Sequence, residues 1–139
     1  MRVFHSMNVA GSSLTAHRLW MDVISENLAN VNTTRTAEGG PYQRRVPVFA
    51  ERLARELDPH SASGGVKVTA IERDSLPPRL EYMPEHPDAN EEGYVAYPNV
   101  NVVREMADML VASRAYEANL SVVTSAEGMW SSALEVLRG

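Results

Sequence analysis

The chain has 139 residues, a net charge of −5 and a pI near 5.3. Its 13 Lys and Arg residues do not cluster, which argues against a basic surface for nucleic acid or anionic lipid. The chain has no cysteine, which excludes disulfides and thiolate metal sites. No apolar run approaches the roughly 18 residues of a membrane span, so no membrane insertion is expected.

The first predicted element is a long helix within residues 1–33. Apolar side chains recur there at alternating spacings of three and four, which places them on one seam and is typical of coiled-coil packing. The seam contains Met7, Ala10, Leu14, His17, Met21, Ile24, Leu28 and Val31. A second, weaker apolar stripe runs along the opposite side. Since a helix in a simple hairpin needs only one buried stripe, this helix is expected to have partners on two sides.

The middle segment, residues 34–98, is rich in Gly, Pro, Thr and charge, and this composition predicts a β-rich insert with loops. Short strands are expected between the turn signals, at 43–49, 66–73, 79–82 and 94–97. The insert would then lie between two long helices, giving a mainly α fold with a small β part.

The last predicted element is a helix over residues 102–137, within a C-terminal segment 99–139. Its seam contains Val102, Met106, Met109, Ser113, Tyr116, Leu120, Val123, Glu127, Trp130, Leu134 and Leu137. Small and apolar residues also fill the opposite side, so we expect the two terminal helices to pair as an antiparallel coiled coil and to complete their burial among other subunits. The alternative is that the β insert covers both backs within one chain.

Two polar residues interrupt the seams, His17 in the first and Glu127 in the second. If the helices are antiparallel with their outer ends level, Met7 faces Leu137 and these two residues face each other. A buried Glu needs such a partner, and a polar pair can fix register. The alternative is that each residue points to solvent, to a channel or to another subunit.

Asparagine residues mark the inner ends of both helices. Asn27, Asn30 and Asn32 stand where the first helix closes, and Asn tolerates left-handed backbone and can satisfy free carbonyls there. In an array, their amides could also reach neighbouring backbones. Asn99 and Asn101 precede the last helix and are good N-caps, and Glu105 lies favourably in its first turn.

The chain also resembles a protein family over nearly its whole length. The segment 25–33, SENLANVNT, is similar to the N-terminal signature of bacterial flagellar rod and hook proteins. More narrowly, a proximal rod subunit of that family is indicated by four motifs: GGPYQR at 39–44, HPDA at 86–89, YPNVNVV at 97–103 and RAYEAN at 114–119. The segment 52–64 is the least similar part.

This resemblance implies a structural subunit that polymerises with copies of itself and other rod proteins around a central export channel. It implies passage through the flagellar type III export apparatus to the periplasm without signal cleavage, and a shaft that transmits torque. The terminal helices would form the inner core. Two alternatives are another rod or hook subunit, and a helical export adaptor or chaperone that binds an amphipathic partner helix.

We expect no enzyme, cofactor or small-molecule substrate. Asp88 to Gly93 begins like a calcium loop, but Asn99 replaces the acidic residue at the twelfth position, so an acidic turn is favoured. The four histidines share no metal-ligand spacing. No nucleophile motif or apolar carboxylate cluster is present.

Overall fold

The computed structural model describes residues 2–52 and 64–138, with side chains from residue 5 onward. Its elements follow in the order α1 (Arg2–Ala29), β1 (Arg45–Glu51), β2 (Val66–Arg73), β3 (Arg79–Tyr82), β4 (Tyr94–Tyr97) and α2 (Val102–Arg138). The expectation of two long helices around a small β part is confirmed, and the last three predicted strands have the predicted bounds. The first strand begins and ends two residues later than expected.

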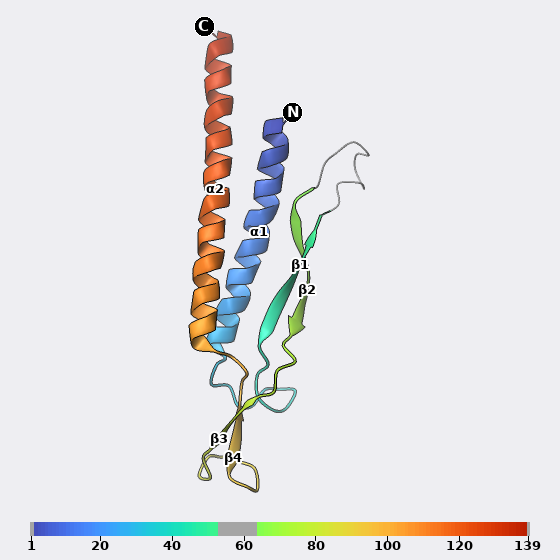
Figure 1. Ribbon diagram of the computed structural model, residues 1–139, viewed down its shortest axis with the longest axis vertical. Helices are drawn as coiled ribbons and strands as arrows, with labels where there is room; N and C mark the ends of the chain where they lie inside the picture. The colour runs from blue at the N-terminus through green and yellow to red at the C-terminus, as the bar shows by residue number, and fades with distance from the viewer. Residues whose placement is uncertain (1, 53–63, 139) are drawn as a thin grey trace.

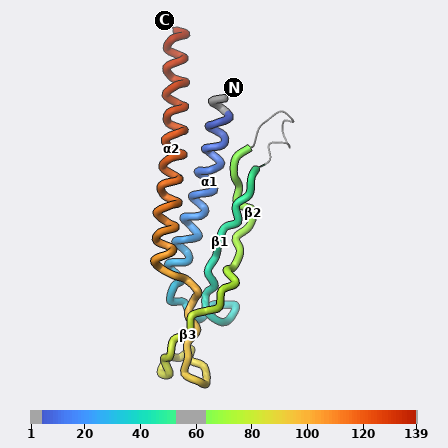
Figure 2. Tube along the Cα trace, viewed as in Figure 1, coloured from blue at the N-terminus to red at the C-terminus, as the bar shows by residue number. Residues whose placement is uncertain are grey.

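The molecule is elongated, with α2, α1 and the β1–β2 ribbon side by side (Figures 1 and 2). Helix α1 runs toward the β3–β4 hairpin and α2 runs back from it, so the two helices are antiparallel. The strands form two separate antiparallel pairs, β1 with β2 and β3 with β4, and not one sheet. The hairpin lies beyond the inner ends of both helices.

Helix α1 is the middle layer, in contact with α2 and with both strands of the ribbon. On the ribbon side, the Val66 N–H donates to Ser12 Oγ at 3.1 Å, and the Ser12 hydroxyl donates to the Val9 carbonyl at 2.7 Å. Trp20 packs edge-on against Phe49 with ring centroids 5.7 Å apart. The ribbon therefore covers much of the second apolar stripe of α1 within the chain.

Helix α2 has a different environment, because α1 is the only described helix or strand on which it packs. The alternative in which the β insert covers both helix backs is therefore right for α1 and wrong for α2. Nowhere in residues 2–52 or 64–138 is a helix both long and apolar enough to cross a membrane.

Candidate assembly interface and polar junction

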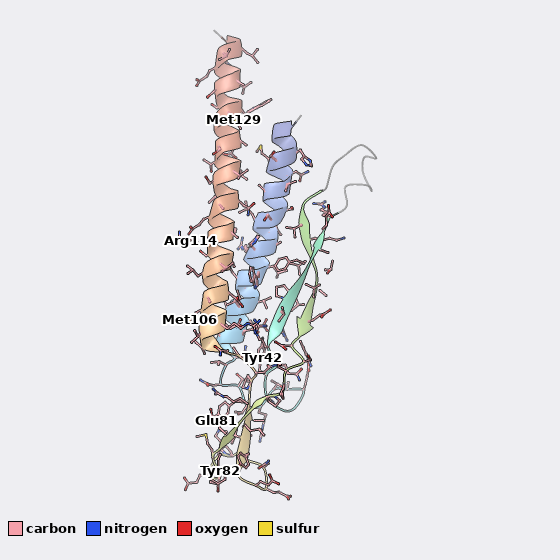
Figure 3. All side chains as sticks on the ribbon, in the orientation of Figure 1. Tyr42, Glu81, Tyr82, Met106, Arg114 and Met129 are labelled. Carbon is pink, nitrogen blue, oxygen red and sulfur yellow. The ribbon has the colours of Figure 1, made fainter. Side chains whose placement is uncertain are left out.

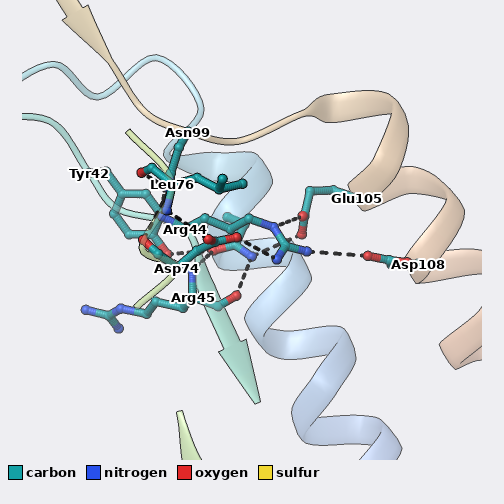
Figure 4. A network of polar contacts seen from close by, with 9 residues as sticks. Tyr42, Arg44, Arg45, Asp74, Leu76, Asn99, Glu105 and Asp108 are labelled. Atoms are coloured by element: carbon teal, nitrogen blue, oxygen red, sulfur yellow. Dashed lines mark hydrogen bonds and ion pairs between the residues drawn. The ribbon is translucent and has the colours of Figure 1, made fainter. Parts of the chain in front are cut away.

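A buried polar junction ties the inner ends of both helices to the ribbon (Figure 4). Asn27, near the end of α1, is almost fully buried and uses its whole side-chain amide. Its Nδ2 donates to the Arg45 carbonyl at 2.9 Å and to Glu105 Oε2 at 3.0 Å. Its Oδ1 accepts from the Tyr42 hydroxyl and from the Arg45 N–H, both at 2.9 Å. One amide therefore joins α1 to β1 and α2.

Arg44 supplies the positive charge of this junction. Its Nε donates to Glu105 Oε1 at 2.6 Å, while Nη1 and Nη2 lie 3.4 Å from carboxylate oxygens of Asp74 and Asp108. The Arg44 side chain is 10% exposed and that of Glu105 is 0% exposed. Because a buried charge is costly unless it is paired and hydrogen-bonded, these contacts are what allow Glu105 to lie inside the fold.

The junction keeps its polar atoms satisfied. Among the described residues, no buried side-chain nitrogen or oxygen is without a hydrogen-bond partner. Burial raises the pKa of the Tyr42 phenol above its usual value, and the Glu26 carboxylate adds to this shift. The phenol therefore stays protonated and remains the donor that Asn27 requires.

The signature asparagines act mainly inside the chain. The Asn30 side chain donates to the Glu26 carbonyl at 2.9 Å, but this carbonyl already accepts from the Asn30 backbone N–H at 3.1 Å, so the side chain is a second donor and does not satisfy a free carbonyl. Asn101 caps α2 by accepting from the Arg104 N–H at 3.1 Å. Asn99 does not cap the helix, because its oxygen accepts from the Arg44 N–H and its nitrogen donates to the Asp74 and Leu76 carbonyls. Asn32 is exposed.

The expectation of left-handed backbone at these asparagines is wrong. The described chain has positive φ values only at glycines, Gly39, Gly40, Gly65 and Gly93. The side-chain hydrogen bonds of Asn27 and Asn30, and not their backbone conformation, therefore explain why asparagine occupies these two positions. Sequence reasoning missed the roles of Arg44 and Glu105, since it assigned Glu105 only to the first turn of a helix.

The segment 88–93 is a turn tied to the loop that follows α1. Asp88 accepts a hydrogen bond from the Thr34 hydroxyl at 2.8 Å and forms an ion pair with Arg35. The hydrogen bond from Thr34 lowers the pKa of the Asp88 carboxyl, and the Arg35 charge acts in the same direction. Asn90 Oδ1 accepts from the Glu92 and Tyr94 N–H groups. Within the described ranges, no three His, Cys, Asp or Glu side chains are grouped to hold a metal ion.

The predicted α1 seam lies mostly inside the molecule. Ile24 is buried, and Met7, Leu14, Met21 and Leu28 are half-buried. Asn27 and Val23, which the seam did not include, are buried as well.

Within one chain, the residues of the predicted α2 seam divide between half-buried and exposed positions. Met109, Tyr116 and Val123 are half-buried, whereas Met106, Leu120, Trp130 and Leu134 are exposed. The buried positions are Glu105, Ala112 and Ala126, seven or fourteen residues apart. Small residues let the two helices approach closely, so the face toward α1 is rotated from the stripe of large side chains. Figure 3 shows Met106 and Met129 along α2, 62% and 59% exposed.

The structure does not bring His17 and Glu127 together within one chain. His17 hydrogen-bonds to Ser13 and lies 6.3 Å from the Phe49 ring centroid, on the ribbon side, and Glu127 is exposed. The contact between Asn27 and Glu105 sets the register, so His17 lies level with about residue 115. Glu127 is twelve residues farther along α2, about 18 Å at 1.5 Å per residue. The assumption of level outer ends was wrong.

Comparisons with known proteins match both helical ends. The family model for flagella basal body rod proteins matches residues 7–35, and the model for the C-terminal region of flagellar basal body rod FlgEFG proteins matches residues 91–136. The chain is 48% identical to the flagellar basal-body rod protein FlgC of Borreliella burgdorferi, with all of both chains covered. It is 42% identical to FlgC of Bacillus subtilis, over 98% of this chain and 99% of that protein. It is 38% identical to FlgC of Escherichia coli O6:H1, over 93% of each.

The paired terminal helices and these matches define a flagellar basal-body rod protein. Within that class, the chain belongs to the FlgC family. It is a structural protein of the flagellar basal body, and this membership favours the rod subunit over the export adaptor.

Proposed function

We propose that the chain polymerises with copies of itself and other rod proteins into the proximal part of the flagellar shaft. In this polymer, the α1–α2 pair forms an inner wall of coiled-coil type around the export channel, and the β segments lie outside. The shaft transmits torque in the periplasm. Each subunit arrives through the flagellar type III export apparatus without loss of a signal peptide.

The exposed apolar surface of α2 carries this proposal. Large apolar side chains on this helix are 40–82% exposed along its whole length, and they are Val102, Val103, Met106, Leu110, Val111, Leu120, Val122, Met129, Trp130, Leu134, Val136 and Leu137. Contiguous apolar surface of this extent is typical of a protein interaction site. Since the strands do not cover α2, neighbouring subunits are the proposed cover.

The signature asparagines have an indirect role in this proposal. Asn27, Asn30, Asn99 and Asn101 hold the inner ends of the helices in place, so that the apolar surface of α2 is presented with a fixed geometry. Asn32 and Asn101 are the exposed members of the set, and Asn32 is the one proposed to reach a neighbouring backbone.

Substitution at Leu110 tests the proposal, because this side chain is 60% exposed and contributes little to the single chain. We expect Leu110→Asp to retain the fold of the dilute monomer but to block incorporation into rods and swimming of a host that lacks its own copy. Leu110→Met keeps an apolar side chain at the same place and is the matched control. Swimming and rod incorporation by the Asp variant at the control level would contradict the proposed role of this surface.

Circular dichroism over a series of concentrations gives a second measurement. Helices that complete their burial in the polymer should gain helicity as concentration rises, and Leu110→Asp should reduce that gain. A dilute monomer that is already fully helical would favour a chaperone-like adaptor.

A further inference from the structure

A polar hollow lies between the loop that follows α1 and the paired ends of β1 and β2. It encloses about 400 Å³. The segment 39–44, GGPYQR, supplies much of its lining, and positive φ values at Gly39 and Gly40 let this loop turn back on itself. Of this motif, the polar junction uses the Tyr42 hydroxyl and Arg44, so the hollow gives its remaining residues a common place.

Two arginines face this hollow together. Arg45 and Arg73 are directly opposite each other in the β1–β2 ladder, and both line the hollow. Side chains that are directly opposite lie on the same face of a ribbon, where like charges are destabilising. Among the described residues, Arg45 is paired only through Nη1 with Glu26, at 2.8 Å, and Arg73 only through Nη2 with Glu38, at 2.6 Å. Since a guanidinium has five N–H donors, most of these donors remain open to a ligand.

The position of Arg45 is fixed before any ligand arrives. Asn27 holds its backbone on both sides, because it accepts from the Arg45 N–H and donates to the Arg45 carbonyl, each at 2.9 Å. The guanidinium carbon lies 5.8 Å from the centroid of the Tyr42 ring. The side chain points away from Arg44 and the junction, as Figure 4 shows. One of the two charges is therefore preorganised for binding.

Glu38 shows which chemical group the hollow can hold. Its carboxylate lines the hollow and contacts Arg73, but the two side chains are 70% and 54% exposed. An ion pair this exposed contributes little to stability, so another carboxylate can displace Glu38. Glu26 and Glu38 together offset the two arginine charges, which favours a singly charged carboxylate over a multiply charged phosphate.

We propose that this hollow binds a carboxylate group between Arg45 and Arg73, and that Glu38 moves aside to admit it. The carboxylate belongs either to an acidic side chain of another protein or to a free carboxylic acid. Two guanidinium groups that converge on one carboxylate give short, charge-assisted hydrogen bonds. The site lies on the ribbon and the loop after α1, apart from the α2 surface proposed for assembly.

Saturation-transfer NMR on the full chain tests the site, because it observes the ligand and works with monomer or polymer. The probes are butyrate, a blocked tripeptide with a central glutamate and the same peptide with a central glutamine. We expect both carboxylates to bind, and the glutamine peptide to bind at least about tenfold more weakly, since charge-assisted hydrogen bonds are lost. Tighter binding of the glutamate peptide than of butyrate identifies a protein side chain as the source. Equal or tighter binding of butyrate identifies a free acid.

Two substitutions should shift the affinity in opposite directions. Arg73→Gln should weaken carboxylate binding by about tenfold or more, without lowering the urea midpoint of unfolding, because the repulsion from Arg45 is also removed. Glu38→Gln should tighten binding by about twofold to fivefold, because the competing carboxylate is gone. Arg79→Gln is the matched control. Arg79 also lies over a tyrosine ring and pairs with a glutamate, but it faces a tyrosine across its ladder and not a second arginine.

Four results would overturn the proposal. They are no saturation transfer to either carboxylate, equal affinity in the parent and Arg73→Gln, weaker binding in Glu38→Gln, and the same loss in Arg79→Gln as in Arg73→Gln. Inorganic phosphate that displaces butyrate and binds more tightly than either carboxylate would overturn the carboxylate as the ligand class. All of these results leave the α2 surface, and with it the rod function, untouched.

Discussion

The ion pair between Glu105 and Arg44 provides the most direct test of the polar junction. In Glu105→Gln the side chain keeps its shape, but one of its two terminal atoms becomes a donor. That donor faces either Arg44 Nε or Asn27 Nδ2, which are donors themselves. One of the two hydrogen bonds, of 2.6 and 3.0 Å, is therefore lost in either orientation of the amide.

The expected magnitude follows from burial. Glu105 is fully buried and the Arg44 side chain is 10% exposed, so water cannot replace the lost carboxylate. Breaking a buried ion pair from one side costs about 3–5 kcal/mol. Asp74 and Asp108 remain 3.4 Å from the guanidinium and retain part of its stabilisation. We therefore expect the free energy of unfolding to fall by about 3 kcal/mol, at the lower end of that range.

Urea unfolding followed by circular dichroism measures this loss. Both proteins must be compared at one low concentration, because assembly would raise the apparent stability. Glu117→Gln is the matched control, since Glu117 pairs with Arg114 on the exposed surface of the same helix. We expect the control to change stability by less than about 0.5 kcal/mol. Equal losses for the two variants would refute the reasoning.

Three further predictions concern the junction and the contact between ribbon and helix. Asn27→Ala removes four hydrogen bonds and should lower the free energy of unfolding by about 2–4 kcal/mol in urea, and a loss below about 1 kcal/mol would contradict this. The raised pKa of Tyr42 keeps its phenol neutral in the folded chain, so its contribution to stability is complete below about pH 10 and falls at higher pH as the unfolded phenol ionises. The free energy of unfolding, measured across alkaline pH, should fall in the parent protein and fall less in Tyr42→Phe. Identical pH profiles for the two proteins would contradict this role of the phenol. Gly65→Ala would place a Cβ 2.1 Å from Ser12 Oγ at a φ of +105°, and should destabilise the chain by about 1–3 kcal/mol in thermal or urea unfolding. Gly11→Ala, with no heavy atom within 4 Å of the new Cβ, should instead stabilise it by about 0.5–1 kcal/mol, and a similar loss in both would exclude the proposed clash.

The sequence predicted the strands well because glycine and proline mark their ends. Val66–Arg73 has a clear period of two and lies between Gly64-Gly65 and Pro77-Pro78, which leaves few alternative bounds. The β1 strand was displaced by two residues, because Arg44 belongs to the junction and not to the ladder.

The face of α2 toward α1 was harder to predict. Met106 and Leu120 form a regular stripe of large side chains, yet Ala112 and Ala126 are the buried residues. A helix with apolar residues on several sides does not reveal which side meets its own chain and which meets another subunit. Periodicity alone could not show which face of α2 packs on α1. The exposed residues Met106 and Leu120 belong to the predicted seam, which also contains half-buried residues.

The amino-acid sequence gives little indication of the ion pair at the junction. Arg44 and Glu105 are 61 residues apart, and neither lies in a pattern that predicts a long-range charge pair. Glu105 also fits a local role in the first turn of α2, where a carboxylate is favourable, and this role gives no indication of a long-range pair. The register of α1 and α2 follows from the contact between Asn27 and Glu105, which is why the expected pairing of His17 with Glu127 failed.

The polar junction also has a consequence for the timing of folding. The hydrogen bond between Asn27 and Glu105 joins residues 78 positions apart, and the one between Arg44 and Glu105 joins residues 61 apart. Such non-local contacts slow folding, because the intervening loop must close before any contact stabilises it. A chain delivered gradually from its N-terminus cannot complete the junction until Glu105 has emerged. For the proposed export route, the junction therefore stays open until about three-quarters of the polypeptide, up to Glu105, has been delivered.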